Sequence, residues 1–336
     1  MIKFCRTCTA FLLLLVTVCV TSCGDASRTP AKGTTPLFTA PAQYPAFSGD
    51  RAFALLEQQV AFGPRVPGTQ AHAACLGFFL AHLDSLGIAT ERQDFTLPGY
   101  DGASLPLTNL IAHINPAAPR RILLAAHWDS RPWSDMETDP DRALLPVPGA
   151  NDGASGVAVL LHLAEILSAD PPPVGVDLVL FDGEDYGREN DESMFLLGSR
   201  YYAATRGSAP PPLFGILLDL VGDREARFPQ EDFSRRYAGD VLDMVWDAAA
   251  ALGLSRFTRE THPPILDDHV PLNTVAGIKT VNIIDAALVG HDDASPRRRY
   301  WHTRADLPHQ CAPEPLGDVG ALLLYLIFGI HPAETT

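Results

Sequence analysis

From Asp50 onward the apolar and polar positions become regular, and helix-like segments alternate with short, continuously apolar runs typical of buried strands. The first helix is expected to begin near Asp50 and to stop before Gly63-Pro64. Further helices are expected over residues 69–86, 153–167, 240–252 and 315–328, and strands over residues 91–97, 107–114, 122–126, 176–181, 213–218 and 280–284. This alternation predicts an α/β fold with a mixed, largely parallel sheet covered by helices on both faces.

The chain before this regular part has a different character. Lys3 and Arg6 precede an apolar run over residues 10–20, which is short for a membrane span, so residues 1–22 are expected to be an export signal. Its ending, Val20-Thr-Ser-Cys23, resembles a bacterial lipobox and predicts a lipid-bearing Cys23. Residues 23–48 lack periodicity and read as a flexible tether. We therefore expect an exported, membrane-anchored lipoprotein facing the periplasm or cell exterior, with one catalytic domain over residues 49–336.

Charge and cysteine content narrow the function further. The chain carries 25 Lys and Arg against 40 Asp and Glu, a formal charge of −15, which argues against a nucleic-acid partner. Four of the six cysteines belong to the export segment or its edge, so they form no redox or metal motif. Cys75 and Cys311 remain, either as a disulfide or as two buried thiols. No P-loop or dinucleotide-binding glycine motif occurs, so no nucleotide cofactor is expected.

Acidic and histidine residues stand at or beyond the ends of the predicted strands, with Asp152 at the entry to the next helix and His302 after a long loop. Sheets of this kind bind ligands at the carboxyl ends of their strands, so these side chains are expected to meet at one edge. Glycines around Asp152 let the backbone turn tightly before the helix that follows. The residues concerned are His127, Asp152, Glu184, Asp185, Asp219 and His302.

Alone, each of these residues has an ordinary interpretation: Asp152 as a helix cap, His302 as a satisfied polar residue, and Glu184 with Asp185 as an exposed acidic pair. Their repeated position after apolar strands favours a shared site instead. Several carboxylates on one rim would repel one another and desolvate badly without a cation among them. One histidine with two carboxylates and an open position is the arrangement of a catalytic zinc.

These residues carry a resemblance to the zinc-aminopeptidase-fold superfamily and, within it, to the bacterial glutaminyl cyclases. The similarity extends from about Phe53 to the last helix. The motifs that carry it are Gly63-Pro-Arg-Val-Pro-Gly68, His127-x-Asp129, Gly149-Ala-Asn-Asp152-Gly-Ala-Ser-Gly156, Asp182-Gly-Glu184-Asp185, Leu218-Asp219-Leu220, Asp267-Asp268-His269 and Trp301-His302-Thr303. The implied fold is a three-layer sandwich with helices on both faces of the central sheet.

The resemblance also implies roles for individual residues. It assigns one zinc ion per chain to Asp152, Asp185 and His302, and the general acid and base to Glu184. Asp219 and the Asp267-Asp268 pair match acids that hydrogen-bond around the reacting centre, and the alignment spacing favours Asp267 within the pair. Trp301 matches an aromatic wall of the substrate pocket. Phe195, a further substrate-binding residue, stands where bacterial cyclases carry a tryptophan. For His127 two roles stay open: a ligand of a second metal ion, or a residue that supports the ligands of the first.

The activity implied is the conversion of an N-terminal glutamine of a peptide or protein to pyroglutamate with release of ammonia. The alternative is a dizinc aminopeptidase, in which His127 and Asp219 would hold a second metal bridged by Asp152. The Glu184-Asp185 pair, where dizinc enzymes usually carry two glutamates, and Trp301 favour the cyclase. A non-catalytic, lipid-anchored binding protein is disfavoured because it has no use for a positioned base. A serine hydrolase is disfavoured because no G-x-S-x-G motif occurs.

The remaining polar residues are assigned ordinary roles. Acids in the 129–141 loop are expected to be solvated or to attract a cationic peptide terminus. His162 and Glu165 are expected to be structural, and His72 and His82 ordinary helix residues. The segment 291–293 is expected to form ion pairs with the arginines of 297–299.

Overall fold

The computed structural model describes residues 37–188, 191–207, 210–290 and 300–332. Pro36–Thr336 form one compact unit. The predicted export signal, the lipid-bearing Cys23 and the segment 291–299 lie outside the described residues. Among the helices of the described ranges, none has the length and apolar character needed to cross a membrane.

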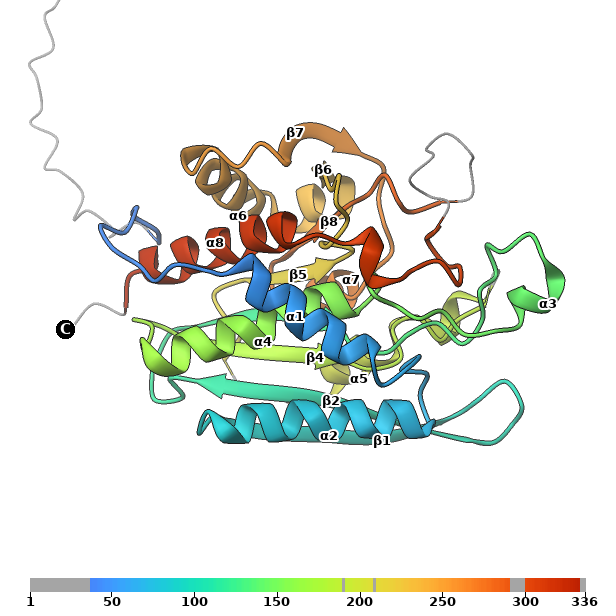
Figure 1. Ribbon diagram of the computed structural model, residues 1–336. Helices are drawn as coiled ribbons and strands as arrows, with labels where there is room; N and C mark the ends of the chain where they lie inside the picture. The colour runs from blue at the N-terminus through green and yellow to red at the C-terminus, as the bar shows by residue number, and fades with distance from the viewer. Residues whose placement is uncertain (1–36, 189–190, 208–209, 291–299, 333–336) are drawn as a thin grey trace, which may run out of the picture. The chain divides into compact units, whose positions relative to one another are not determined.

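A six-stranded sheet forms the centre of the domain (Figure 1). Its order is β1-β2-β4-β3-β5-β8, antiparallel between β1, β2 and β4 and parallel from β4 to β8. This confirms the predicted mixed, largely parallel sheet. The strands are β1 (Ala89–Pro98), β2 (Ser104–Ile114), β3 (Arg121–His127), β4 (Gly175–Phe181), β5 (Gly215–Asp219) and β8 (Thr280–Ile284).

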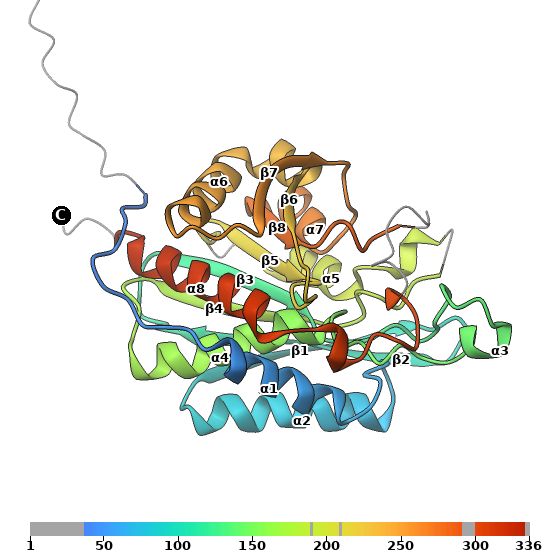
Figure 2. The same cartoon turned by 45° about the horizontal axis from the view of Figure 1, so that its top comes forward.

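Helices cover both faces of this sheet, as Figure 2 shows from a second direction. Alternate residues of one strand point to opposite faces, so Leu124 packs in the larger apolar cluster and Leu123 in the smaller. The larger cluster includes residues of α1 (Gly49–Val60), α2 (Gln70–Ser85), α4 (Ala154–Ala169), α6 (Asp232–Ala251) and α8 (Pro313–Gly329). The smaller includes Tyr202 of α5 (Leu197–Thr205) and Leu272 of α7 (His269–Thr274).

Helix starts follow the capping residues. Ser48 Oγ accepts a hydrogen bond from the backbone N–H of Arg51 at 3.2 Å, and Thr69 Oγ1 accepts one from His72 at 3.2 Å. Helix α6 instead begins eight residues before the predicted start at 240, where Glu231 caps Phe233 and Ser234. Ala238, with φ −138° and ψ 38°, interrupts this helix, so the pattern reveals only its second part.

The elements that the pattern did not predict are short or polar. Helix α7 has six residues and contains Pro271. Helix α5 has nine residues and lacks a regular helical spacing of apolar positions. Also unpredicted are α3 (Pro140–Ala143), the 3₁₀ turns η1 (Glu192–Met194) and η3 (Pro308–Gln310), and β6 (Phe228–Glu231) with β7 (Phe257–His262), which pair in a separate two-stranded sheet.

The described part of the predicted tether belongs to the fold. Phe38 forms a bridge with Ile330, and the N–H of Thr39 donates to the Gly329 oxygen at 2.9 Å. Phe47 lies against the His162 ring with centroids 4.6 Å apart. The folded domain therefore begins before the expected boundary between residues 48 and 49. The composition of residues 23–48 did not distinguish Phe38 and Phe47 from linker residues. Cys75 and Cys311 are both free and buried, so they are thiols and not a disulfide.

Candidate metal centre and active site

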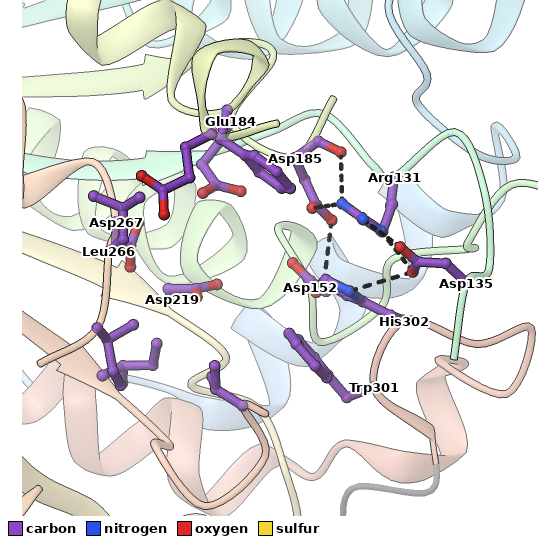
Figure 3. Close-up of a pocket in the computed structure, with 15 residues that line it drawn as sticks. Arg131, Asp135, Asp152, Glu184, Asp185, Asp219, Leu266, Asp267, Trp301 and His302 are labelled. Atoms are coloured by element: carbon purple, nitrogen blue, oxygen red, sulfur yellow. Dashed lines mark hydrogen bonds and ion pairs between the residues drawn. The ribbon is translucent and has the colours of Figure 1, made fainter. Parts of the chain in front are cut away.

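The predicted site residues meet at the carboxyl ends of the parallel strands (Figure 3). His127 ends β3, Asp219 ends β5, Glu184 and Asp185 follow β4, and Asp152 lies just before α4. The pocket at this edge has a volume of about 230 Å³. Its lining includes Arg131, Asp135, Asp152, Glu184, Asp185, Phe195, Asp219, Asp267, Trp301 and His302.

Asp152, Asp185 and His302 form a group whose ligand atoms all lie within 4.8 Å of one another. His302 Nε2 is 3.6 Å from an oxygen of Asp152 and 3.6 Å from an oxygen of Asp185. All three residues are buried, with 6%, 3% and 9% of their surface exposed. Two buried carboxylates beside one imidazole are unfavourable without a cation, and this donor set fits zinc. The residues present therefore fit the metal that the sequence predicts.

His127, Asp152 and Asp219 form a second group of the same kind. His127 Nε2 is 3.1 Å from Asp152 Oδ1 and 3.3 Å from Asp219 Oδ1. Asp152 belongs to both groups, with Oδ1 facing His127 and Oδ2 facing His302. The two groups together have the residue composition of either a one-metal site with a supporting histidine or a two-metal site bridged by Asp152.

Burial and neighbouring negative charges raise the pKa values of several carboxyl groups in the pocket. Burial raises the pKa of Glu184 well above its ordinary value, and the charges of Asp185, Asp267 and Asp268 raise it further. Burial, with Asp267 and Asp152 nearby, raises the pKa of Asp219 to about 7 although His127 lowers it. Burial lowers the pKa of His127, but Asp129, Asp152 and Asp219 outweigh it and hold that pKa well above its ordinary value. Raised carboxyl pKa values suit general acid and base catalysis.

Backbone turns and buried carboxylates hold the two ligand-bearing loops in place. Gly153 has φ +86°, and a Cβ there would lie 2.8 Å from the Asp129 oxygen. Asp129 is fully buried and accepts hydrogen bonds from the backbone N–H groups of Glu184 and Asp185 at 3.1 and 3.2 Å. Asp306 likewise accepts from the N–H of Asp152 at 3.1 Å. The loops carrying Asp152 and Asp185 are therefore anchored by hydrogen bonds to neighbouring side chains.

Three residues with left-handed backbone conformations accompany the site. His302 itself has φ +53°, Leu220 after Asp219 has φ +50°, and Leu196 after Phe195 has φ +59°. For residues with a Cβ this conformation is strained, and such strain gathers at functional sites where the surrounding structure enforces it. The fold therefore fixes these side chains at some cost in stability.

The walls of the pocket combine aromatic rings with one member of the acidic pair. Trp301 stacks on the His302 imidazole with ring centroids 3.7 Å apart, and Phe195 also lines the pocket. Asp267 faces the pocket. Asp268 instead accepts a hydrogen bond from Ser199 Oγ at 2.5 Å. Of the two acids, Asp267 therefore faces the pocket and Asp268 faces Ser199.

Two acids expected to be solvated or to attract a peptide terminus have other contacts. Asp129 is fully buried beneath the Glu184 loop. Asp135 pairs with Arg131 at the pocket. The burial of Asp129 corrects the expectation of a solvated or attracting acid, whereas Asp135 is exposed at the pocket and agrees with it. The spacing of the acids gave no signal that Asp129 is buried, because the backbone N–H groups that it accepts from belong to the distant loop after β4.

Among the histidines, His72 differs from the expectation of an ordinary helix residue. Its Nε2 lies 2.9 Å from Asp182 Oδ1, and its ring stacks on Trp128 with centroids 4.1 Å apart. This pair supports the end of β4, two residues before Glu184. His162 and Glu165 are structural as expected. His162 Nδ1 lies 2.7 Å from Glu165 Oε2, and Glu165 also pairs with Arg51. Arg131 and Asp306 were missed, since nothing in the sequence marks their contacts with metal-ligand loops.

Comparison with known proteins agrees with this geometry. The sequence profile of "Peptidase family M28" matches residues 109–327. The solved glutaminyl cyclase of Bacteroides thetaiotaomicron is 36% identical, with 85% of this chain and 99% of that chain covered and a TM-score of 0.79. A Zn-dependent exopeptidase from Parabacteroides distasonis gives the same identity, coverage and TM-score. A mouse glutaminyl-peptide cyclotransferase-like protein is 28% identical over 77% of this chain and 70% of its own length. On this profile match and these site residues, the chain belongs to peptidase family M28.

Proposed function

We propose that the protein is a zinc-dependent glutaminyl-peptide cyclotransferase. The observation that carries the proposal is the buried group Asp152, Asp185 and His302 with Glu184 in the same aromatic-walled pocket. This pocket occurs in a chain 36% identical, over 85% of its length, to a solved protein described as a glutaminyl cyclase. The substrates are peptides or proteins with an N-terminal glutamine.

Asp152, Asp185 and His302 would hold the zinc ion. Zinc bound there supplies a Lewis acid that polarises the γ-carbonyl group of the substrate. The reacting amine and amide belong to one glutamine residue, so the reaction is intramolecular and depends mainly on orientation and charge. The stacked pair of Trp301 and His302 forms one side of the space in which this side chain folds.

Glu184 is the group that moves the proton. The α-amine nitrogen attacks the γ-amide carbon, and the bond from that carbon to the amide nitrogen breaks. Glu184 takes one proton from the amine and returns it to the departing nitrogen, which leaves as ammonia. The amine has a pKa of about 7.7 to 8.0, so roughly a tenth of it is already neutral at pH 7 and little further activation is needed. Such a proton transfer contributes about 10²- to 10⁴-fold to the rate.

Asp219 and Asp267 lie around the same space and accept hydrogen bonds from the substrate amine and amide in this scheme. Figure 3 shows the Glu184 carboxyl group turned towards Asp267, inside the pocket. Because the pKa of Asp219 is raised to about 7, this acid is able to share a proton with a substrate group near neutral pH. The acids thus surround the proton that Glu184 transfers.

The test is a comparison of two substrates with the purified protein. A peptide beginning with glutamine should yield free ammonia and a peptide that is about 17 Da lighter. This mass difference is that of one ammonia molecule, lost in the intramolecular reaction. A leucine anilide should stay intact. Hydrolysis of the anilide without ammonia release from the glutamine peptide would refute the cyclase.

A second candidate is a two-metal aminopeptidase, favoured by the group His127, Asp152 and Asp219. The Parabacteroides distasonis structure described as a Zn-dependent exopeptidase is as similar as the cyclase structure. In this candidate a water molecule, and not the substrate amine, is the nucleophile. The anilide assay and the metal content both separate it from the cyclase.

We further propose that the protein is exported and attached to a membrane through lipid on Cys23. The support is the sequence alone: a cationic start, a short apolar run and the lipobox-like Val20-Thr-Ser-Cys23. Labelling of growing cells with a radioactive fatty acid should mark the wild-type protein and not Cys23→Ala. Equal labelling of both would remove the anchor from the proposal.

A further inference from the structure

Arg131 connects two of the three proposed zinc ligands through contacts that the reaction scheme does not use. Its Nη1 donates to Asp185 Oδ1 at 2.6 Å (Figure 3). Its Nε donates to Asp135 Oδ1 at 2.9 Å, and its Nη2 donates to the other Asp135 oxygen. The Arg131 side chain is only 2% exposed, so a rigid guanidinium fork is held between two carboxylates away from water.

Asp135 continues this connection to the third ligand. Its Oδ1 lies 3.6 Å from His302 Nδ1, on the side of the ring opposite to the ligand group. A carboxylate behind a metal-binding histidine fixes the orientation and the tautomer of its ring. The chain of contacts therefore runs from Asp185 through Arg131 and Asp135 to His302.

These contacts leave one ligand atom free on each residue. Since Arg131 engages Oδ1 of Asp185, the oxygen facing His302 Nε2, at 3.6 Å, is Oδ2. Since Nδ1 of His302 faces Asp135, the nitrogen facing Asp152 and Asp185 is Nε2. We propose that Arg131 and Asp135 are positioning residues that select which atoms of Asp185 and His302 face the zinc ion. This inference takes the zinc site from the proposed function.

The charges agree with this role. Arg131 and Asp135 cancel one another, so the two negative charges of Asp152 and Asp185 remain to match a divalent cation. The Arg131 guanidinium also lies 5.3 Å from the centre of the Phe195 ring, on the apolar wall of the pocket. One buried side chain therefore supports both the metal ligands and the wall against which the substrate rests.

The decisive variant is Arg131→Lys, which keeps the charge and loses the planar fork. Metal-free protein is titrated with zinc ions in competition with a chromogenic chelator. Loss of such supporting contacts typically weakens metal binding by about 10- to 100-fold, so zinc affinity should fall by at least about tenfold. Asp135→Asn should weaken it as well, because His302 loses the carboxylate behind its ring. Unchanged affinity in Arg131→Lys overturns the proposal.

Arg131→Met separates positioning from simple charge neutralisation. Removal of the cation makes the site more negative, which by itself favours zinc. Positioning predicts weaker binding despite that charge, and tighter binding would overturn the proposal. Arg142→Lys is the matched control, since Arg142 pairs with Glu137 in the same loop at 2.8 Å with its side chain 52% exposed; it should leave zinc affinity unchanged.

The experiment also separates misfolding of a variant, and failure of the proposed function, from failure of this inference. Melting temperatures of the metal-free variants show whether each one is folded, and if Arg131→Lys is unfolded, Asp135→Asn decides the question, with unchanged zinc affinity overturning the proposal. The titration uses no peptide. A wild-type protein that binds zinc but does not cyclise glutamine would refute the proposed function and leave this inference standing.

Discussion

His127 Nε2 lies 3.1 Å from Asp152 Oδ1, on the side of Asp152 away from His302. Asp219 approaches the same nitrogen at 3.3 Å. The imidazole thus occupies the space between two carboxylates that would otherwise repel each other. Burial lowers the pKa of His127, but the two carboxylates and Asp129 raise it by more and so favour the protonated ring, which lies where the two-metal candidate would hold its second ion.

This relationship predicts the metal content of the protein. The wild-type protein should hold about one zinc ion per chain, because one complete ligand set is left when His127 pairs with Asp152 and Asp219. His127→Ala should still hold one. Inductively coupled plasma mass spectrometry on dialysed protein measures both.

The aminopeptidase candidate makes the opposite prediction. Two tightly held ions in the wild type, with one lost in His127→Ala, would show that His127 is a ligand and that Asp152 bridges two metals. His269→Ala is unsuitable as a control because His269 is fully buried against Glu231. His262→Ala serves instead, because the half-buried His262 ends β7 with its ring near the Pro263 oxygen, and it should leave the zinc content unchanged.

Glu184→Gln should retain the zinc ion and lose most of the turnover. The amide keeps the size of the side chain but accepts no proton, so the rate of ammonia release should fall by about 10²- to 10⁴-fold. A coupled ammonia assay measures the rate, and metal analysis of the same sample measures the zinc. Glu57→Gln, an exposed change on α1, is the control and should match the wild type. Full activity in Glu184→Gln would remove Glu184 from the reaction.

Much of this site was predictable because its ligands follow apolar strands. The carboxyl ends of parallel strands necessarily meet at one edge, so His127, Asp185 and Asp219 could be placed together from their position after β3, β4 and β5. His302 is separated from its strand by a long loop, and its assignment as a zinc ligand rested on the family resemblance. The ligand set was therefore accessible from strand order and motif together.

The supporting contacts were not accessible in the same way. Arg131, Asp135 and Asp306 stand in loops where no periodicity applies, and their partners are decided by the path of the backbone. Asp129 looked like one more acid in an acidic loop, yet it is buried under two backbone N–H groups. Such contacts depend on the complete fold, whereas the strands depend on a local pattern.

Gly153→Ala should destabilise the protein by about 1 to 3 kcal/mol and weaken zinc binding. Its φ of +86° is strained for alanine, and the new Cβ would lie 2.8 Å from the Asp129 oxygen and 2.9 Å from His127 Cε1. The shift needed to relieve these contacts would move Asp152. Urea unfolding of the metal-free protein measures the stability, and chelator competition measures the zinc.

Gly253→Ala is the matched control for the backbone cost. Gly253 has φ +71°, but no atom lies within 4 Å of a Cβ placed there. It should therefore show the cost of the left-handed backbone alone and leave zinc affinity unchanged. Equal effects of the two changes on stability and on zinc binding would contradict a role for close packing at Gly153.

The last prediction concerns pH and the opposite end of the sheet. A hydrogen bond to Asp177, with His113 Nδ1 2.7 Å from Asp177 Oδ1, raises the pKa of His113 above 6.5 although partial burial lowers it. A raised folded-state pKa means that folding takes up protons, so the stabilisation is fully present below pH 6.5 and is lost as the pH rises through the folded-state pKa. The difference in unfolding free energy between the wild type and His113→Gln should therefore shrink from pH 5.5 to pH 8. Urea unfolding of both proteins at each pH measures it, and titrations common to both cancel. A difference that grows with pH would mean that His113 is neutral when it bonds to Asp177.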